Sequence, residues 1–300
     1  MQRVNKSPQS ILIPFLVACV GIALFSVMDG VMKGLVLAIG AYNAMLWRQG
    51  AGFLIGGTAF VLSRSRWPSP AAMRLHFIRG IVGGALAFAF FWGIARVPLA
   101  EGIALSFIAP IITLFLASII LKERISRSSI IASLLGLAGV GVILSARIGG
   151  RHDDEALLGV ASILLSAVLY AYNLILQRQQ AQIATPVEVA FFVNIFAFAG
   201  MALGAPWLAT LPASEHALPI VFAAALAFVS MLLLSWSYGR AEAQLLVPVE
   251  YTAFIWAAII GWVIFSEPLT PETVIGTGLI VAGCLISARQ RPVHVETTAL

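Results

Sequence analysis

A few charged side chains stand inside long apolar stretches of the sequence, and these are the first candidates for chemistry. Glu250 and Tyr251 lie a few residues inside one such stretch, after Pro248, and Arg48 lies inside another, next to Trp47. A charged side chain in a membrane span costs at least about 2.5 to 3.5 kcal/mol on insertion scales, so each one is a candidate for function. We therefore expect these residues either to meet a charged ligand or to pair with another side chain.

Two interpretations stand for each of these residues. The planar guanidinium group binds a carboxylate through two parallel charge-assisted hydrogen bonds, so Arg48 is a candidate for a substrate carboxylate. The alternative is that Arg48 extends to the outer interface beside Trp47. Glu250 either faces a cavity and binds a cationic group or pairs with a neighbouring arginine. Tyr251 points to a different helix face, so we expect only one of the two to line a substrate path.

Asp29, Lys33 and Arg79 are further charged candidates. Asp29 and Lys33 are four residues apart, so one expectation is that they pair along one helix face. The alternative is a polar position that Asp29 shares with Asn173, its counterpart in a later stretch. Arg79 opens an apolar stretch, and we expect it either to anchor the interface or to reach the inner mouth of a cavity.

Two tryptophans complete the candidate site, and a metal site is not predicted. Trp92 and Trp236 are expected either in the interfacial aromatic belt or as aromatic walls that hold a cation or a flat ring. The acidic stretch 152–155 contains one histidine and three acids, but it is typical of a solvated loop. No GxxxxGK[ST] motif occurs, which excludes a built-in P-loop ATPase. The other histidines lie at or beyond the ends of the apolar stretches, so we expect neither a cofactor nor a metal.

The elements that position these side chains follow from the composition. Apolar residues make up 60% of the 300 residues and charged residues 10%, against about 25% charged in ordinary globular domains. This excludes a soluble protein and predicts an all-α integral membrane protein, with the lipid bilayer as its surroundings. The net charge of +5 comes without a basic run, so no nucleic-acid partner is expected. Cys19 and Cys284 lie in apolar stretches and do not predict a disulfide.

The apolar stretches predict ten transmembrane helices, each about 20 residues long. We place them at 11–29, 42–63, 75–94, 99–120, 128–147, 157–177, 187–208, 218–238, 245–265 and 272–288. With this number of spans, thirteen of the 18 Lys and Arg residues fall on the side of the chain termini and five near the other side. The bias predicts that both termini are cytoplasmic and that the protein lies in a bacterial inner membrane.

The two halves of the chain repeat at an offset of 144 residues. The offset takes Trp92 to Trp236, Arg96 to Arg240, Glu123 to Glu267 and Asp29 to Asn173. We expect Glu123 and Glu267 to act as helix-end or loop contacts that hold each half together. The predicted organisation is a first repeat (1–147), a loop (148–156), a second repeat (157–290) and a cytoplasmic tail (291–300). Since each half holds five spans, an odd number, the repeats are predicted to be inverted, as in many secondary transporters.

Several motifs resemble the EamA-type family of the drug/metabolite transporter superfamily. They are Trp92-Gly93-Ile94-Ala95-Arg96-Val97-Pro98-Leu99-Ala100-Glu101, Ser106-Phe107-Ile108-Ala109-Pro110, Leu121-Lys122-Glu123-Arg124-Ile125 and Phe265-Ser266-Glu267-Pro268-Leu269-Thr270. The resemblance implies ten helices around a central cavity, lined mainly by the third, fourth, eighth and ninth helices with contributions from the first and sixth. It also gives Arg48 the place of the family's second-helix arginine. The sequence departs from the family where Phe254 is the repeat mate of Pro110.

Two short stretches resemble one branch of that family, which contains S-adenosylmethionine uptake carriers. They are Asp29-Gly30-Val31-Met32-Lys33 and Pro248-Val249-Glu250-Tyr251. We expect a secondary transporter, not an enzyme, for a small polar or zwitterionic metabolite such as S-adenosylmethionine or an amino-acid-like compound. A proton or an exchanged solute is the expected coupling partner, with Glu250 and Asp29 as candidate proton-binding groups, and the protein is expected to be a monomer or homodimer. The alternatives are an exporter of amino acids, metallophores or toxic metabolites, a riboflavin-type vitamin carrier and, more remotely, a membrane-embedded enzyme acting on lipid-linked substrates.

Overall fold

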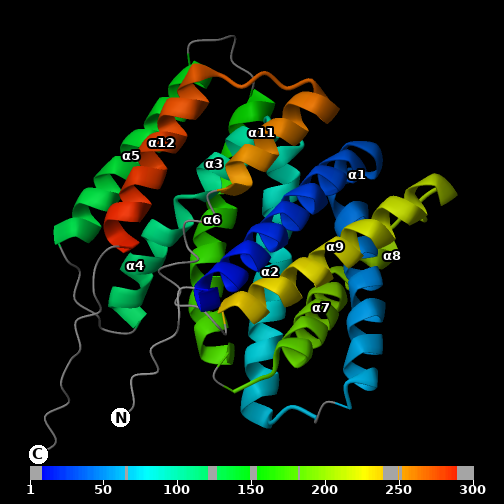
Figure 1. Ribbon diagram of the computed structural model, residues 1–300. Coiled ribbons are helices and arrows are strands. Elements are labelled where there is room, and N and C mark those ends of the chain that lie inside the picture. The colour runs from blue at the N-terminus through cyan, green and yellow to red at the C-terminus, as the bar shows by residue number, and fades with distance from the viewer. Residues whose placement is uncertain are drawn as a thin grey trace, which may run out of the picture.

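The structure, a computed structural model, is entirely helical over the residues it describes, which are 9–64, 67–120, 127–148, 154–181, 183–238, 249 and 252–288 (Figure 1). The helices are α1 (Gln9–Leu62), α2 (Pro70–Ile94), α3 (Leu99–Ser106), α4 (Ala109–Ile120), α5 (Arg127–Ile148), α6 (Asp154–Ala181), α7 (Pro186–Ala202), α8 (Ala205–Leu208), α9 (Ser214–Tyr238), α11 (Thr252–Phe265) and α12 (Pro271–Ala288). Each of the ten predicted spans therefore contains helix.

The first two predicted spans form the two arms of α1, and the predicted end of the first span was wrong. The first arm continues through Asp29 and Lys33 to Gly40, where the backbone turns with φ 78° and ψ 156°. Glycine is nearly alone in reaching this conformation, because it has no Cβ. Asp29 and Lys33 therefore lie within the first arm, where Lys33 finds hydrogen-bond partners elsewhere in the chain.

The fourth predicted span, 99–120, is not one continuous helix. It consists of α3 and α4, separated by Phe107 and Ile108, whose N–H groups bond to the carbonyl groups of Ala104 and Leu105. Pro110 follows in the first turn of α4, where its missing N–H costs no intrahelical hydrogen bond. The short three-residue hydrogen-bonded turns close α3 before the chain starts a new helix.

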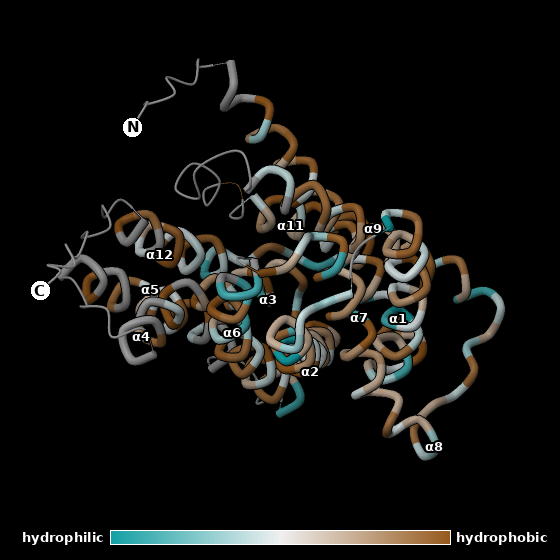
Figure 2. Tube along the Cα trace, turned by 90° about the horizontal axis from the view of Figure 1, so that it is seen from below, coloured by the Kyte–Doolittle hydropathy of each residue, from teal (hydrophilic) through white to brown (hydrophobic). Residues whose placement is uncertain are grey.

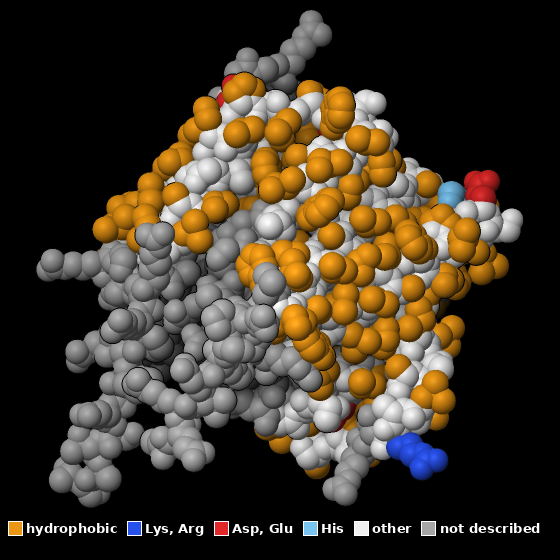
Figure 3. Space-filling view, viewed as in Figure 1, with side chains coloured by type: hydrophobic (Ala, Val, Ile, Leu, Met, Phe, Trp, Pro, Cys, Tyr) orange, Lys and Arg blue, Asp and Glu red, His pale blue; other side chains and the backbone are white. Residues whose placement is uncertain are grey.

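Four helical stretches of the described chain are long and apolar enough to cross a membrane. They are Ile13–Leu62, which covers both arms of α1, Pro70–Ile94, Asp154–Gln177 and Ser214–Leu234. The space-filling view shows an almost continuous hydrophobic face over α1, α9 and α11, with basic atoms only at its lower edge (Figure 3). The first turn of α9, which contains Glu215 and His216, is hydrophilic, whereas the traces of most helices are largely hydrophobic (Figure 2). An apolar outer surface of this extent suits lipid and not water.

Two helix pairs, one containing α2 and α6 and the other α1 and α9, pack through contacts that are related by the sequence repeat. Ser166 Oγ on α6 donates to the carbonyl O of Leu86 on α2 at 2.8 Å, and Ser230 Oγ on α9 donates to the carbonyl O of Gly21 on α1 at 2.7 Å. Adding 144 to 86 gives Ser230, and subtracting 144 from 166 gives Ile22, which is next to Gly21. The α2–α6 and α1–α9 pairs therefore use equivalent contact points.

The α5–α12 pair packs at a glycine crossing. An added Cβ at Gly139 would lie 2.5 Å from the carbonyl O of Gly276, and one at Gly276 would lie 2.6 Å from the carbonyl O of Gly139. Backbones approach this closely only where neither residue carries a side chain. The pair lies beside the rest of the bundle, as Figure 1 shows at the left.

Candidate functional site

Asp29 and Arg48 are two buried residues of opposite charge, one from each arm of α1. Their exposed fractions are 5% and 8%. The two groups act on each other electrostatically, yet they are not joined by an ion pair within 4.0 Å. Within the described part of the chain, Asp29 receives no hydrogen bond. A buried charge without a direct partner is costly, so this pair is incomplete as it stands.

The Arg48 guanidinium has little to bind. Its Nε has no hydrogen-bond acceptor, and Nη2 lies 3.8 Å from Sδ of Met45, which is a weak acceptor. The ring of Phe91 on α2 lies 5.9 Å from the guanidinium carbon. Oε1 of the neighbouring Gln49 is also buried without a donor. The expectation that Arg48 extends to the outer interface is wrong, because the side chain is packed inside the bundle.

Lys33 pairs with Glu267 and not with Asp29, so the expected pairing along one helix face is wrong. Lys33 Nζ donates to Oε1 of Glu267 and, at 2.8 Å, to the carbonyl O of Val97. Oε2 of Glu267 accepts the backbone N–H of Leu99 at 2.8 Å. The expectation that Glu267 holds its own half together is also wrong, since this loop residue of the second half binds two elements of the first. We call Lys33, Glu267, Val97 and Leu99 the Lys33–Glu267 cluster.

Arg79 and Asn173 come together, in the company of two glutamines on α6. Arg79 Nε donates to Oδ1 of Asn173 at 3.2 Å, Nη2 donates to Oε1 of Gln177 at 3.1 Å, and Nη1 donates to Oε1 of Gln180. Arg79 is 7% exposed, so it is not an interfacial anchor, and that expectation is wrong. In the described chain, its positive charge is bound by amide oxygens only.

The repeat makes the isolation of Asp29 clearer. The 144-residue offset takes Asp29 and Lys33 on α1 to Asn173 and Gln177 on α6. Arg79 binds both α6 residues, and Glu267 binds Lys33. Of these four equivalent positions, Asp29 is the one to which the described residues give no hydrogen bond. The described residues thus supply hydrogen-bond partners for Lys33, Asn173 and Gln177, but none for Asp29.

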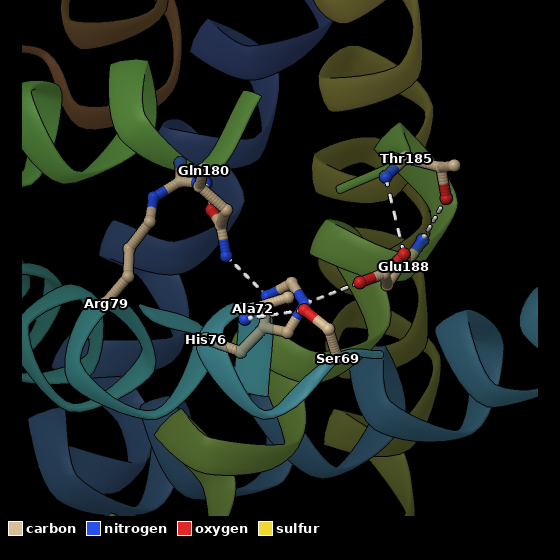
Figure 4. A network of polar contacts seen from close by, with 7 residues as sticks. All are labelled: Ser69, Ala72, His76, Arg79, Gln180, Thr185 and Glu188. Carbon is tan, nitrogen blue, oxygen red and sulfur yellow. Dashed lines mark hydrogen bonds and ion pairs between the residues drawn. The ribbon is translucent and has the colours of Figure 1, made fainter. Parts of the chain in front are cut away.

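A chain of buried side chains continues from Arg79, and sequence reasoning missed it (Figure 4). Nε2 of Gln180 contacts Nδ1 of His76, and Nε2 of His76 lies 2.9 Å from Oε1 of Glu188 on α7. Oε2 of Glu188 accepts the backbone N–H of Thr185 in a capping box at the start of α7. The signal in the sequence is the three-residue spacing of His76 and Arg79, and of Gln177 and Gln180, which puts each pair on one helix face.

Trp92 and Trp236 take part in none of the contacts described above. Trp92 does hold a cation over its ring, but it is the guanidinium of Arg96, 3.4 Å from the ring centroid, which also bonds to Glu155 at 2.7 Å. Trp236 on α9 is 37% exposed. Glu250 and Tyr251 lie outside the described residues, so the predictions for them stay predictions.

An open hollow lies elsewhere, between α1 and α9. Its volume is about 310 Å³, and Val31, Leu35, Ala38 and Pro219 line it, with His216 at its edge. It contains none of the predicted site residues. In the part of the chain that the structure describes, His, Cys, Asp and Glu residues form no group of three that could hold a metal ion.

Comparison with known proteins gives a family match over almost the whole chain. The family model described as "EamA-like transporter family" matches residues 12–145 and 157–289. An "Uncharacterized transporter" of Helicobacter pylori (strain J99) is 29% identical over 70% of this chain and 72% of its own length. The "Pseudopaline exporter CntI" of Pseudomonas aeruginosa is 24% identical over 89% of this chain and 93% of its own.

Two more distant similarities complete the comparison. The "S-adenosylmethionine uptake transporter" of Rickettsia prowazekii is 23% identical over 70% of each chain. A solved structure described only as "Crystal structure of protein" superposes with a TM-score of 0.61 at 22% identity, covering 92% of this chain and 96% of that one. At this identity the solved structure supports the fold alone.

Proposed function

This chain belongs to the EamA-like transporter family, and we propose that it is a secondary transporter for a small polar or zwitterionic metabolite. It is a membrane transporter by family, and relatives across its length carry transporter and exporter names. The two repeats are inverted in this proposal, and they expose a central site alternately to the two sides of the bacterial inner membrane. Both chain termini lie in the cytoplasm.

The observation that carries the substrate class is the incomplete pair of Asp29 and Arg48. A zwitterion brings an anionic and a cationic group within a few ångströms of each other, which matches two buried protein charges that stop short of an ion pair. Arg48 takes the substrate carboxylate through its unfilled Nε and terminal N–H groups. Asp29 takes the cationic group, and Glu250, as predicted from the sequence, is a second acid for the same role.

The charges of Arg48 and Asp29 define a class of substrate, compounds with a carboxylate close to a cationic group. S-adenosylmethionine and amino acids both carry an α-ammonium carboxylate, and a relative is named for uptake of the former. Export is the alternative direction, because another relative is named an exporter. A riboflavin-type vitamin is a weaker candidate, since riboflavin carries no cationic group that Asp29 could bind.

The test is transport into vesicles by purified protein. We expect protein reconstituted into liposomes and given a pooled extract of bacterial metabolites to carry α-amino carboxylates across the membrane, detected by mass spectrometry of the vesicle contents. Arg48→Gln is expected to weaken the apparent affinity for the carried compound at least tenfold, because the carboxylate loses a bidentate partner. Arg48→Lys keeps the positive charge but loses the planar guanidinium, so its apparent affinity is expected to lie between those of the wild type and Arg48→Gln.

Arg96→Gln is the matched control. Arg96 also pairs with an acid, Glu155, but the two side chains are 26% and 68% exposed, so its loss should leave transport within about twofold. If wild-type vesicles carry no compound from the pool, the proposed function fails. If Arg48→Gln transports with the apparent affinity of the wild type, the assignment of Arg48 fails.

A further inference from the structure

The contacts of Arg79, Gln180, His76 and Glu188 form one line of hydrogen bonds, which we call the polar relay (Figure 4). It runs from α2 to α6, back to α2, and then to α7. Each of its members is at least 93% buried. A cation stands at one end of the relay and an acid at the other, with two groups between them that can each act as donor or acceptor. None of these four residues forms a hydrogen bond or an ion pair with Asp29 or Arg48.

The cation at one end fixes the proton positions in the rest of the relay. Arginine has donors only, so the atom of Gln180 that faces Arg79 must be its carbonyl oxygen. The amide nitrogen of Gln180 then points at Nδ1 of His76 and donates to it. Nδ1 therefore carries no proton, and the ring proton sits on Nε2, where it is donated to Glu188. In this arrangement His76 is neutral.

A second proton on His76 cannot enter this arrangement without rearranging it. It would sit on Nδ1, opposite the amide N–H of Gln180, and would put two donors face to face. Rotation of the Gln180 amide by half a turn restores the bond to His76, because the carbonyl oxygen then accepts the new proton. The same rotation turns the amide N–H groups toward Arg79, which loses its acceptor. Gln180 can thus satisfy protonated His76 or Arg79, but not both.

We propose that His76 is a proton-binding site whose occupancy controls Arg79 through Gln180. When His76 is neutral, Arg79 is held by three amide oxygens. When His76 is protonated, Nη1 of Arg79 is released and becomes available to an anion, while the positively charged ring pairs more strongly with Glu188. Protonation of His76 thereby favours binding of an anionic group, which couples a proton to a carboxylate. The transport consequence rests on the proposed function, but the proton site does not.

The charged surroundings of His76 are few among the described residues. Glu188 on α7 is the acid in contact, and the basic residues on the same helix are Arg79, which is linked to His76 through Gln180, and the exposed Arg74. From α6, Tyr170 acts electrostatically on Arg79, and the side chain of Arg178 lies outside the described residues. The ring of Phe192 stacks on His76 at 5.2 Å between centroids, with an interplanar angle of 17°.

The remaining neighbours add no charge at His76. On the outer side of Phe192 are the rings of Phe60 on α1 and of Trp67 in the loop that follows it. The short helix α3 packs against the opposite end of α2. The acid and the released arginine are thus the two charged groups of the described chain through which a proton on His76 acts.

The first experiment follows the protons directly and needs no substrate. The full chain, labelled with ¹⁵N in histidine and arginine, is placed in lipid nanodiscs, and spectra are recorded between about pH 8 and pH 5, where histidine titrates. The signal absent from His76→Gln identifies His76 among the four histidines. We expect a bare Nδ1 at high pH, proton uptake at Nδ1 on acidification, and a change in the Arg79 signals in step with it. His76→Gln is expected to abolish that change in Arg79.

Gln180→Glu gives a second route to the same answer. A carboxylate accepts from both neighbours, so His76 is expected to carry the Nδ1 proton at every pH in this variant, and Arg79 to show no step. The proposal is overturned if Nδ1 is already protonated at high pH in the wild type. It is equally overturned if Arg79 responds to acid in His76→Gln as in the wild type.

The second experiment tests coupling in vesicles with the compound that the wild type carries. We expect His76→Gln to exchange labelled for unlabelled compound at a rate within twofold of the wild type. The accumulation of the compound that a pH gradient drives is expected to be at least tenfold lower in this variant. His216→Gln is the matched control, because the imidazole of His216 pairs with Glu215, at 3.5 Å, and has no contact with the polar relay; it should leave both the exchange rate and the accumulation unchanged. Wild-type accumulation in His76→Gln overturns the coupling. Absence of any transport by the wild type refutes the proposed function instead, while the titration still decides the proton site.

Discussion

The Lys33–Glu267 cluster predicts that substitutions of Lys33 and Glu267 have non-additive effects on the free energy of unfolding. The two side chains are 4% and 18% exposed, and Leu99 donates its N–H to the same carboxylate. Removing one partner of a buried ion pair costs about 3 to 5 kcal/mol. Because Glu267 keeps the bond from Leu99 and some contact with water, we expect Lys33→Met to lower the free energy of unfolding by about 2 to 3 kcal/mol.

A double-mutant cycle isolates this pair from the other effects of each substitution. Glu267→Gln alone leaves Lys33 without its anion, so we expect the double variant to lose about 2 kcal/mol less than the sum of the single variants. The free energies come from reversible unfolding in mixed micelles with increasing dodecyl sulfate, followed by tryptophan fluorescence. The control cycle uses Arg96→Met and Glu155→Gln, an exposed pair whose coupling should stay below about 1 kcal/mol. A coupling for Lys33 and Glu267 no larger than that of the control would refute the reasoning.

Two glycine comparisons in the same unfolding assay test the packing of the helices. Gly139→Ala should lower the free energy of unfolding by about 1 to 3 kcal/mol, because its Cβ would meet the carbonyl O of Gly276, whereas Gly141→Ala, with open space around it, should raise it by about 0.5 to 1 kcal/mol. Equal effects would contradict the close crossing. Gly40→Ala should cost about 1 to 3 kcal/mol because of its positive φ, while Gly34→Ala, also in open space, should stabilise α1 slightly. A Gly40→Ala protein as stable as Gly34→Ala would show that the bend in α1 does not require glycine.

Much of the fold was predictable because its signal is local. An apolar stretch reports a helix whatever it packs against, so all ten predicted spans contain helix. The ends of the spans were harder to predict, as the first one illustrates. Asp29 and Lys33 looked like the end of a span, but Lys33 is buried because Glu267, 234 residues away in the sequence, supplies its counter-charge. No local pattern carries that information.

The candidate site shows the same division. Residue type and position in an apolar stretch selected Asp29, Arg48 and Arg79, and the repeat selected Asn173, which is in contact with Arg79. Residue type does not show which charged groups already have hydrogen-bond partners in the folded protein. Arg48 has a donor, Nε, without an acceptor, whereas Arg79 is bound by three acceptors. His76 was overlooked because it stands near the start of a span, where histidine is ordinarily solvated.

The glycines that face α7 bear on the order in which the chain is assembled. Gly52 and Gly56 on α1 face Asn194 and Phe191, and Gly80 and Gly84 on α2 face Phe196 and Ala197, all on α7. Two grooves in the first half of the chain are thus filled by a helix of the second. Because α7 follows both helices in the chain, we expect these glycine faces to reach the packing seen here only after α7 has been synthesised. The two halves are repeats in sequence, yet they mature together as one interlocked unit.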